Sequence, residues 1–330
     1  MARIPEPVSR PGGRPDIFLK GNDMIVVSGE ALMDVFVTRH TSSGLSLDAR
    51  VGGSPLNVAI GLARLGQRVA YFGALSQDFL GDRLMQALED EGVANDCVAR
   101  LDAPTTLSLV GLDAAGVPTY AFYGDGAADR GLPLDTLRHV PPALAFHFGS
   151  YSMVVEPVAT TQRALIEREC QRSVIAYDPN IRLNVEPDIQ RWRQALLWML
   201  PRTALIKISD EDLGLVYPGQ ATEDLARHWL AAGVALVVVT RGAQGAWAWT
   251  AAQHVVSTPT AVSVVDTVGA GDSFLAALLT ALAERQLLTR TALSSLSRPD
   301  LEAALNFATR AAAITCSRRG ADLPRRAELP

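Results

Sequence analysis

The residues best suited to chemistry are an aspartate and the small residues before it, in the stretch 266–274, which reads Asp-Thr-Val-Gly-Ala-Gly-Asp-Ser-Phe. It follows a β-rich segment, 255–265, and opens an apolar run, 274–288, with helical spacing. Small residues let backbone N–H groups approach a ligand, and the unpaired amides at a helix start attract anions. Asp272 adds a carboxylate beside that anion site. The alternative is that Asp272 is an N-cap that merely starts the helix, and these residues alone leave both interpretations open.

Other polar residues fall at the ends of apolar strands. The segment 52–57, Gly-Gly-Ser-Pro-Leu-Asn, opens an Ala/Leu-rich helix that ends near Gly66. Five apolar runs break directly into Gly29-Glu30, Gly149-Ser150, Asp178-Pro179-Asn180, Ser209-Asp210 and Thr240-Arg241-Gly242. Turns also enrich these residue types. Because ligands of open α/β sheets bind beyond the carboxyl ends of the strands, we expect one extended cleft there.

The order of these elements predicts the fold class. Apolar strands alternate with helical patterns, two of which are 81–91 and 301–315, and this alternation predicts a mostly parallel sheet covered by helices. The predicted strands are 24–28, 69–75, 144–148, 174–177, 204–208 and 235–239. Residues 105–112 and 119–123 flank a turn at 113–118 and predict a β-hairpin, and 247–256 predicts a further antiparallel pair.

Composition narrows the class of protein. With 330 residues, 48% hydrophobic and 20% charged, the chain is globular rather than disordered, and a net charge of −5 without a basic block argues against nucleic acid as the main partner. No apolar run approaches the roughly 18 residues of a membrane span. Residues 1–22, rich in Pro, Gly and Arg, lack the apolar core of a signal peptide and predict a flexible N-terminal tail. Cys97, Cys170 and Cys316 are far apart, which suits a reducing cytoplasm.

Two familiar phosphate-binding loops are excluded. The chain has only two lysines, Lys20 and Lys207, and neither follows the glycine of a Walker A loop. A phosphate site would therefore use helix amides, arginines and a metal ion. A dinucleotide-dependent dehydrogenase is also disfavoured, because Gly269-x-Gly271-x-x-Phe274 lacks the third glycine and lies near the C-terminus.

The two glycine motifs together resemble the two signatures of the ribokinase-like (PfkB) carbohydrate kinases. They are Gly52-Gly53-x-x-x-Asn57-x-Ala59 and the stretch 266–274, in that order and about 210 residues apart. The resemblance covers about residues 24–324. Three further segments look most like bacterial fructokinases: Gly29-Glu30-x-x-x-Asp34, Asp178-Pro-Asn180-x-Arg182 and Lys207-Ile-Ser209-Asp-Glu.

The resemblance implies a three-layer α/β/α sandwich with a mostly parallel central sheet and a small β-sheet lid. It places the kinase domain at 23–328, with lid strands inserted near 34–48 and 104–125. Lids of the family close over the sugar and sometimes pair, so it also implies a homodimer through the lid.

The implied reaction moves the γ-phosphoryl of ATP to a sugar hydroxyl, with D-fructose giving fructose 6-phosphate. The resemblance makes Asp272 the base and Gly269, Ala270 and Gly271 the anion hole. It assigns the sugar to Asp34, Gly53, Asn57 and Arg182. Other interpretations remain for three of these: a helix cap for Asn57, a solvated turn for Asp34 and an exposed surface arginine for Arg182.

The resemblance also implies a nucleotide side and two cation sites. ATP would meet Lys207, Ser209, Thr240, Gly242, Gly245 and Thr309, although many relatives have Asn where this chain has Thr309. Asp212 would organise Mg²⁺ through water. Asp266 and Val268, opposite the loop 316–320, would hold a monovalent cation such as K⁺. Ser209-x-x-Asp212 also fits a helix capping box, a purely structural device.

Several functions remain open on the sequence alone. Within the family the nearest rival is a 2-keto-3-deoxygluconate kinase, followed by ribose and nucleoside kinases. A different class is a sugar-binding regulator that has kept the fold and lost catalysis. The presence of Asp272 with a complete Gly-Ala-Gly segment favours the enzyme.

Overall fold

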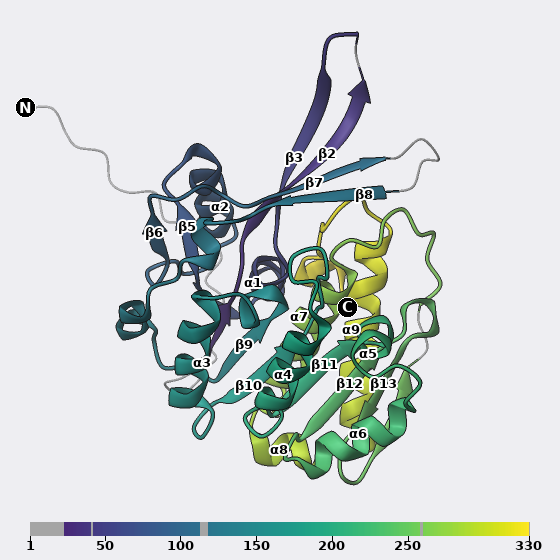
Figure 1. Cartoon of the computed structure of the whole chain (residues 1–330). Coiled ribbons are helices and arrows are strands. Elements are labelled where there is room, and N and C mark those ends of the chain that lie inside the picture. Colours follow the sequence, from purple (N-terminus) through teal and green to yellow (C-terminus); the bar gives the residue numbers. More distant parts are fainter. Residues whose placement is uncertain (1–22, 41, 113–117, 258–259, 330) are drawn as a thin grey trace, which may run out of the picture.

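The computed structural model describes residues 23–329 except 41, 113–117 and 258–259. Eight of the described strands form the central sheet (Figure 1). In order across the sheet they are β14 (His254–Ser257), β13 (Ala246–Trp249), β12 (Leu236–Thr240), β11 (Leu205–Ser209), β10 (Val174–Asp178), β9 (Ala145–Gly149), β1 (Met24–Ser28) and β4 (Arg68–Phe72). All neighbours pair in parallel except β12–β13 and β13–β14, which are antiparallel. The predicted parallel sheet with a terminal antiparallel pair is confirmed.

The parallel strands are covered by helices on both faces. They therefore appear in the sequence as continuous apolar runs, which is why they could be predicted. Two strand predictions were wrong in extent. The β-rich segment 255–265 is a strand only to Ser257, and residues 260–265 form no strand. The run 69–75 divides at Gly73 into β4 and β5 (Ala74–Ser76), because β5 leaves the central sheet and pairs with β6 (Ala99–Leu101).

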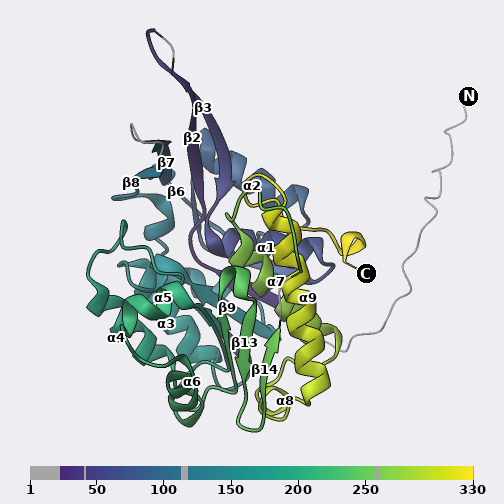
Figure 2. The ribbon, with the colours of Figure 1, turned by 90° about the vertical axis from the view of Figure 1, so that its right-hand side faces the viewer.

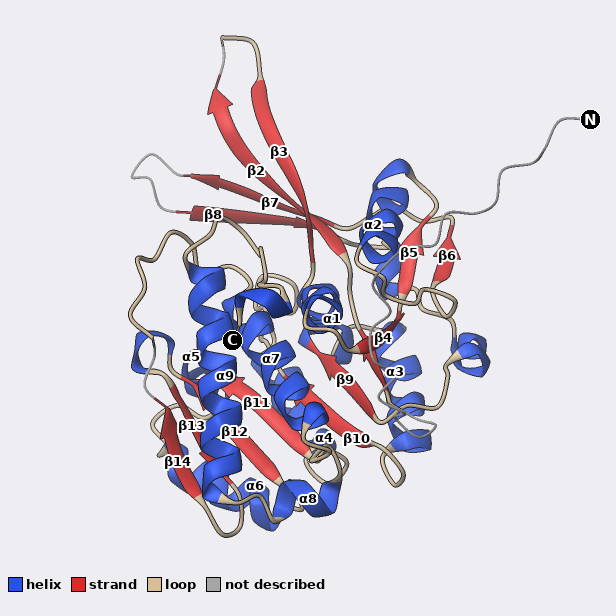
Figure 3. Cartoon of the chain, turned by 180° about the vertical axis from the view of Figure 1, so that it is seen from behind, coloured by secondary structure: helices blue, strands red, loops and turns tan. Residues whose placement is uncertain are grey.

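Helices cover both faces of the sheet and complete three layers (Figure 3). One face packs against α1 (Ser54–Arg64), α2 (Phe79–Asp90), α7 (Ala270–Glu284), α8 (Arg290–Ser294) and α9 (Arg298–Cys316). The other packs against α3 (Val158–Glu169), α4 (Ile189–Met199), α5 (Asp210–Val216) and α6 (Thr222–Ala231). Short 3₁₀ turns are η1 (Ala128–Arg130), η2 (Leu134–His139), η3 (Ser150–Met153), η4 (Gly242–Gln244) and η5 (Arg326–Glu328). Among the described helices, none combines the length and apolarity needed to cross a bilayer.

Helix α7 begins within the Gly-Ala-Gly-Asp segment, so the helix start predicted there is confirmed. The helix runs from Ala270 to Glu284, whereas the apolar run with helical spacing is 274–288. Gly269, in the left-handed conformation at φ 77°, is the residue before it. The Gly-Ala-Gly-Asp segment therefore lies in the first turn of the helix rather than in a loop before it.

A separate sheet projects from the sandwich (Figures 1 and 2). Its described strands are β3 (Leu45–Gly52), β2 (Leu32–His40), β7 (Leu107–Leu112) and β8 (Pro118–Tyr123), in that order. Both segments predicted for the lid thus form strands of one small sheet. The turn predicted at 113–118 lies outside the described residues except for Pro118, and the predicted tail 1–22 lies outside them entirely.

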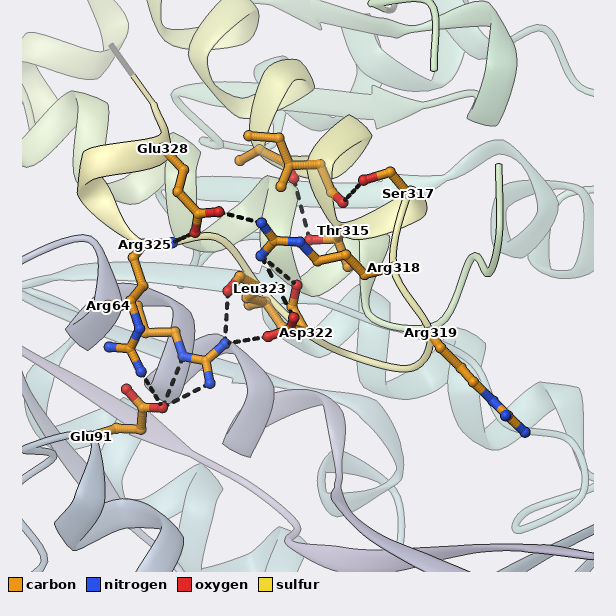
Figure 4. A network of polar contacts seen from close by, with 12 residues as sticks. Arg64, Glu91, Thr315, Ser317, Arg318, Arg319, Asp322, Leu323, Arg325 and Glu328 are labelled. Atoms are coloured by element: carbon orange, nitrogen blue, oxygen red, sulfur yellow. Dashed lines mark hydrogen bonds and ion pairs between the residues drawn. The ribbon is translucent and has the colours of Figure 1, made fainter. Parts of the chain in front are cut away.

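The segment after α9 is tied to α1 by a network of ion pairs (Figure 4). Arg64 donates hydrogen bonds to Glu91, to Asp322 at 2.9 Å and to the Leu323 carbonyl at 2.7 Å. Arg325 reaches the same Glu91 carboxylate at 3.1 Å. Because Arg64 and Glu91 are largely buried, the bonds of Arg64 to Glu91 and to the Leu323 carbonyl are partly shielded from water and hold the C-terminal segment against α1.

We expect Arg64→Ala to lower the free energy of unfolding by about 2 kcal/mol, because it leaves the partly buried Glu91 carboxylate with fewer partners. Thermal or urea unfolding measures this change. Arg83→Ala is the matched control, since the Arg83–Asp90 pair spans 3.9 Å with both side chains exposed, and its effect should lie within about 0.5 kcal/mol. Equal effects of the two variants would contradict the role given to the network.

Candidate active site

A cavity of about 440 Å³ lies where the carboxyl ends of β1, β9, β10 and β11 meet the projecting sheet. Most of the residues predicted to carry catalysis or to bind sugar line it. These are Asp34, Gly53, Asn57, Arg182, Gly269, Gly271 and Asp272, whereas Ala270 does not line the cavity. Lys207 from the predicted nucleotide side and Val268 from the predicted cation site also line it. One extended cleft was expected at the five polar strand ends. Three of these segments line the cavity, through Glu30, Ser150 and Asn180.

Asp272 is buried at the centre of the cavity wall. Its Oδ1 accepts a hydrogen bond from Ser54 Oγ at 2.6 Å, and its Oδ2 accepts one from Asn57 Nδ2 at 2.9 Å. Burial raises the pKa of this carboxyl above its ordinary value, against the opposing effect of the two donors. Because Asp272 is the third residue of α7 and Gly269 precedes the helix, the N-cap interpretation of Asp272 is wrong.

The helix-cap interpretation of Asn57 is also wrong. Asn57 lies within the first turn of α1, and its side chain points to Asp272 instead of to its own helix end. Ser54, which the sequence analysis did not select, supplies the other donor. The two motifs about 210 residues apart in sequence are therefore joined through the carboxylate of Asp272.

Close approach leaves no room for a side chain at Gly53 or Gly269, and little room at Gly271. A Cβ at Gly269 would lie 2.6 Å from Ala321 Cβ, and one at Gly271 would lie 3.0 Å from Lys207 Nζ. At Gly53, with φ 104°, a Cβ would lie 2.7 Å from the Glu30 carbonyl oxygen. Gly269 and Gly271 also line the cavity and have no side chain to block a ligand from the first amides of α7, which suits an anion.

Asp34 lies in β2 of the small sheet, so the interpretation as a solvated turn is wrong. Burial raises the pKa of Asp34, while a hydrogen bond with Ser108 and the charge of Arg182 lower it. Arg182 is exposed and lines the cavity at the same time, which makes it available to a ligand. These groups offer a carboxylate, a hydroxyl and a guanidinium to a polyhydroxyl ligand.

Glu30 is a buried acid that the sequence analysis placed at a strand end without giving it a role. Burial raises its pKa to about 8, although a hydrogen bond with Ser150 acts in the opposite direction. Asp129 adds to the increase, and it is itself held by Thr106 and by Tyr151, whose hydroxyl donates at 2.7 Å. Glu30 therefore lines the cavity as an acid that releases its proton less readily than an ordinary glutamate.

Lys207 and Asp178 form a buried ion pair on neighbouring strands, with Nζ 2.7 Å from Oδ2. Asp212 lies close enough for burial and the charge of Asp178 to raise its pKa to about 6. Ser209 accepts a hydrogen bond from the Asp212 amide as the N-cap of α5, so the structural capping role is confirmed for Ser209.

The predicted nucleotide residues on β12 and α9 lie outside this cavity. Thr240 ends β12, Gly242 begins η4 and Gly245 follows it, at the same carboxyl edge of the sheet. Thr309 is buried in α9 and shares a hydrogen bond with Ser257 at 3.0 Å. Its hydroxyl is thus already engaged within the protein.

Asp266 and the loop 316–320 were predicted to lie opposite each other, and hydrogen bonds join them. Asp266 accepts hydrogen bonds from the amides of Val268 at 3.1 Å and Gly320 at 2.8 Å. Its own amide donates to the Cys316 carbonyl at 3.2 Å. Across the described residues, no group of three or more His, Cys, Asp or Glu side chains is arranged to hold a metal ion.

Comparison with known proteins agrees with this geometry. The model of the pfkB family carbohydrate kinases matches residues 22–327. A fructokinase of Rhizobium leguminosarum bv. trifolii is 36% identical over 279 residues, 84% of this chain and 85% of that protein. Among solved structures, the fructokinase of Xylella fastidiosa with bound ATP superposes with a TM-score of 0.84 at 26% identity, over 93% of this chain and 97% of that one.

The fructokinase of Vibrio cholerae O395, solved with fructose, ADP and calcium ion, gives a TM-score of 0.77 at 26% identity, again over 93% of this chain and 97% of that one. The family match covers nearly the whole described chain and both glycine motifs. This chain belongs to the pfkB family of carbohydrate kinases.

Proposed function

We propose that the protein is an ATP-dependent fructokinase that converts D-fructose to fructose 6-phosphate. The observation that carries the proposal is the position of Asp272, buried between the glycines at the start of α7 and the sugar-side residues of the small sheet. The fructokinase relatives, including structures with bound ATP and with fructose and ADP, support the same substrates.

In the proposed reaction a sugar hydroxyl lies beside Asp272. The hydroxyl oxygen forms a bond to the γ-phosphorus, the bond from that phosphorus to the bridging oxygen breaks with its electron pair leaving on ADP, and the hydroxyl proton passes to Asp272. Phosphoryl transfer depends on position and charge more than on a strong base, so a carboxylate suffices. Ser54 and Asn57 fix its direction.

The residues present fit a nucleotide polyphosphate. Gly269, Ala270 and Gly271 leave the first amides of α7 open to the cavity, and the helix dipole favours the negative charge that develops there. We assign Thr240, Gly242 and Gly245, at the adjoining sheet edge, to the rest of the nucleotide. For Thr309 the proposed contact with adenine requires its bond to Ser257 to open or to be shared.

Mg²⁺ also fits, held through water and the nucleotide phosphates rather than by a cage of protein ligands. Asp212 on α5 is near enough to the cavity-lining Arg182 and Lys207 to interact with both charges, and its carboxylate is a ligand type that suits Mg²⁺. Bound there, the ion would neutralise phosphate charge. For a monovalent cation we propose the backbone of Asp266 and Val268 with the loop 316–320, which hydrogen bonds already hold together.

We further propose a cytoplasmic homodimer formed through the lid. β3 is an edge strand of the small sheet, and Leu45 and Leu47, 54% and 53% exposed, point from the same face of it. An exposed edge strand with apolar side chains is suited to pairing with a second copy. Use of ATP as a substrate is consistent with the cytoplasm.

A panel of acceptors tests the proposed function. ADP formation should be measured with ATP, Mg²⁺ and each of D-fructose, 2-keto-3-deoxygluconate, ribose and adenosine. We expect the highest kcat/KM with fructose. Preference for 2-keto-3-deoxygluconate would move the assignment within the family, and no turnover with any acceptor would favour a catalytically silent sugar-binding regulator.

Asp34→Asn should raise the KM for fructose about 10- to 100-fold, because the acceptor oxygens for sugar hydroxyls are reduced in number and charge. The KM for ATP should change less than about twofold. Asp125→Asn, at a fully exposed side chain near the end of β8, is the matched control and should leave both constants unchanged. Equal effects of Asp34→Asn on both KM values would remove Asp34 from the sugar side.

A further inference from the structure

Lys207, which the family resemblance placed among the nucleotide residues, is a buried cation that has no role in the reaction described above. Its side chain is 5% exposed, and Asp178 Oδ2 takes one of its three N–H donors at 2.7 Å. Across the part of the chain that the structure describes, no other hydrogen bond of this ammonium is present. Burying an ammonium group costs folding free energy, and a buried ion pair can often be replaced by apolar side chains without loss of stability. Stability alone therefore does not account for a lysine at this position.

The ammonium lies directly behind the start of α7. A Cβ at Gly271 would come within 3.0 Å of Nζ, so no side chain separates Lys207 from the second residue of the helix. Lys207 also lines the cavity together with Gly269, Gly271 and Asp272. Its two remaining donors are thus beside the amides that we assign to the transferring phosphoryl group.

The groups that surround Lys207 come from four elements. They are His147 on β9, Asp178 on β10, Asp212 on α5 and Asp272 on α7. Burial lowers the pKa of His147 to about 4, so this imidazole is neutral and adds no positive charge. Lys207 therefore acts on these three carboxyl groups from within the sheet, while Arg182 acts on Asp212 from the loop after β10.

We propose that Lys207 contacts oxygens of the phosphoryl group during its transfer, and that Asp178 is a positioning residue that holds the ammonium behind Gly271. The inference rests on the proposed function and names the cationic part of the same site. As the oxygen of the sugar hydroxyl bonds to phosphorus and the bond to ADP breaks, Lys207 keeps its protons and neutralises charge on the non-bridging oxygens, while the hydroxyl proton goes to Asp272.

Binding of ADP with aluminium fluoride and fructose, a mimic of the transferring group, tests this contact without turnover. We expect Lys207→Gln, whose amide can still donate to Asp178, to weaken binding of the mimic about 100-fold and to change binding of ADP alone less than about threefold. In the same variant kcat should fall about 100-fold or more, with the KM for fructose within about threefold. Isothermal titration and steady-state kinetics measure these quantities.

A double variant keeps the test valid if a single change prevents folding. Lys207→Met with Asp178→Asn removes both members of the pair and leaves no buried charge unpaired. If Asp178 acts only through Lys207, this variant should bind the mimic as weakly as Lys207→Gln, and Asp178→Asn should add nothing to the loss. Additive losses would show that Asp178 has a separate role and would contradict its assignment as a positioning residue.

Arg168→Met is the matched control, because it removes an ion-pair partner from the buried Glu169 on α3, away from the cavity. It should lower stability and leave the mimic's affinity unchanged. Undiminished affinity for the mimic in Lys207→Gln or in the double variant would overturn the proposal, as would a wild-type protein that binds the mimic no more tightly than ADP. Absence of sugar turnover in a wild-type protein that binds the mimic would instead count against the proposed function.

Discussion

Replacing Asp272 with asparagine should reduce kcat about 10²- to 10⁴-fold, the range typical of losing a general base. Asparagine has the same shape and can still accept a hydrogen bond from Ser54, but it cannot take the proton of the sugar hydroxyl. The KM values for ATP and fructose should change little. Steady-state kinetics with both substrates, together with a thermal unfolding curve, measure the effect.

The variant should have about the wild-type stability at neutral pH, because removing the buried charge offsets the loss of the acceptor for Asn57. Burial raises the pKa of Asp272 in the folded protein above its ordinary value, so ionisation of this group opposes folding above that ordinary value. A neutral amide removes the penalty. For the same reason kcat/KM of the wild type should decline as the pH falls through the raised pKa, where the base becomes protonated. A kcat near the wild-type value in a well-folded Asp272→Asn would remove Asp272 from the chemistry.

Gly269→Ala should have the second-largest effect, a loss of kcat of about 100-fold with a higher KM for ATP. The added Cβ would lie 2.6 Å from Ala321 Cβ and 2.8 Å from Ala321 Cα, at a residue with φ 77°. Backbone on both sides must move, and a shift of about 1 Å in the amides of α7 is enough to cost this much rate. Kinetics and Tm should both be measured.

Gly219→Ala separates the two causes of that loss. Gly219 has the same φ of 77°, but nothing lies within 4 Å of its added Cβ. It should show only the cost of the left-handed conformation, about 1 kcal/mol, with unchanged kinetics. If Gly269→Ala behaved like Gly219→Ala, the close approach of Gly269 to Ala321 would be irrelevant to phosphoryl transfer.

Much of the fold was predictable because its strands are buried on both faces. Strands such as β1 and β12 appear as short apolar runs, and the residue types alone identify them. The strand predicted from segment 255–265 was too long, because valines continue the apolar pattern beyond the end of β14. Val264 and Val265 are 62% and 63% exposed, so they cover no core and their β propensity meets no partner strand.

Site residues could be predicted where they belong to a sequence motif. They could not be predicted where their properties depend on burial in the folded protein. Asp272, Asn57 and Asp34 were found from their motifs, and all three line one cavity. The raised pKa of Glu30 depends chiefly on burial, which no local pattern reveals, and to a smaller extent on Asp129, about 100 residues away in sequence. Ser54 was not selected from the sequence, because no local pattern shows that this first residue of α1 donates to a carboxylate on another helix.

The central claim is that this cavity transfers the γ-phosphoryl of ATP to fructose. Product analysis by ³¹P nuclear magnetic resonance, after incubation of the protein with ATP, Mg²⁺ and D-fructose, tests it most directly. We predict fructose 6-phosphate and ADP in equal amounts, and neither from the Asp272→Asn variant on the same timescale. ADP formation that does not depend on fructose, or a phosphate on any other carbon of the sugar, would contradict the account.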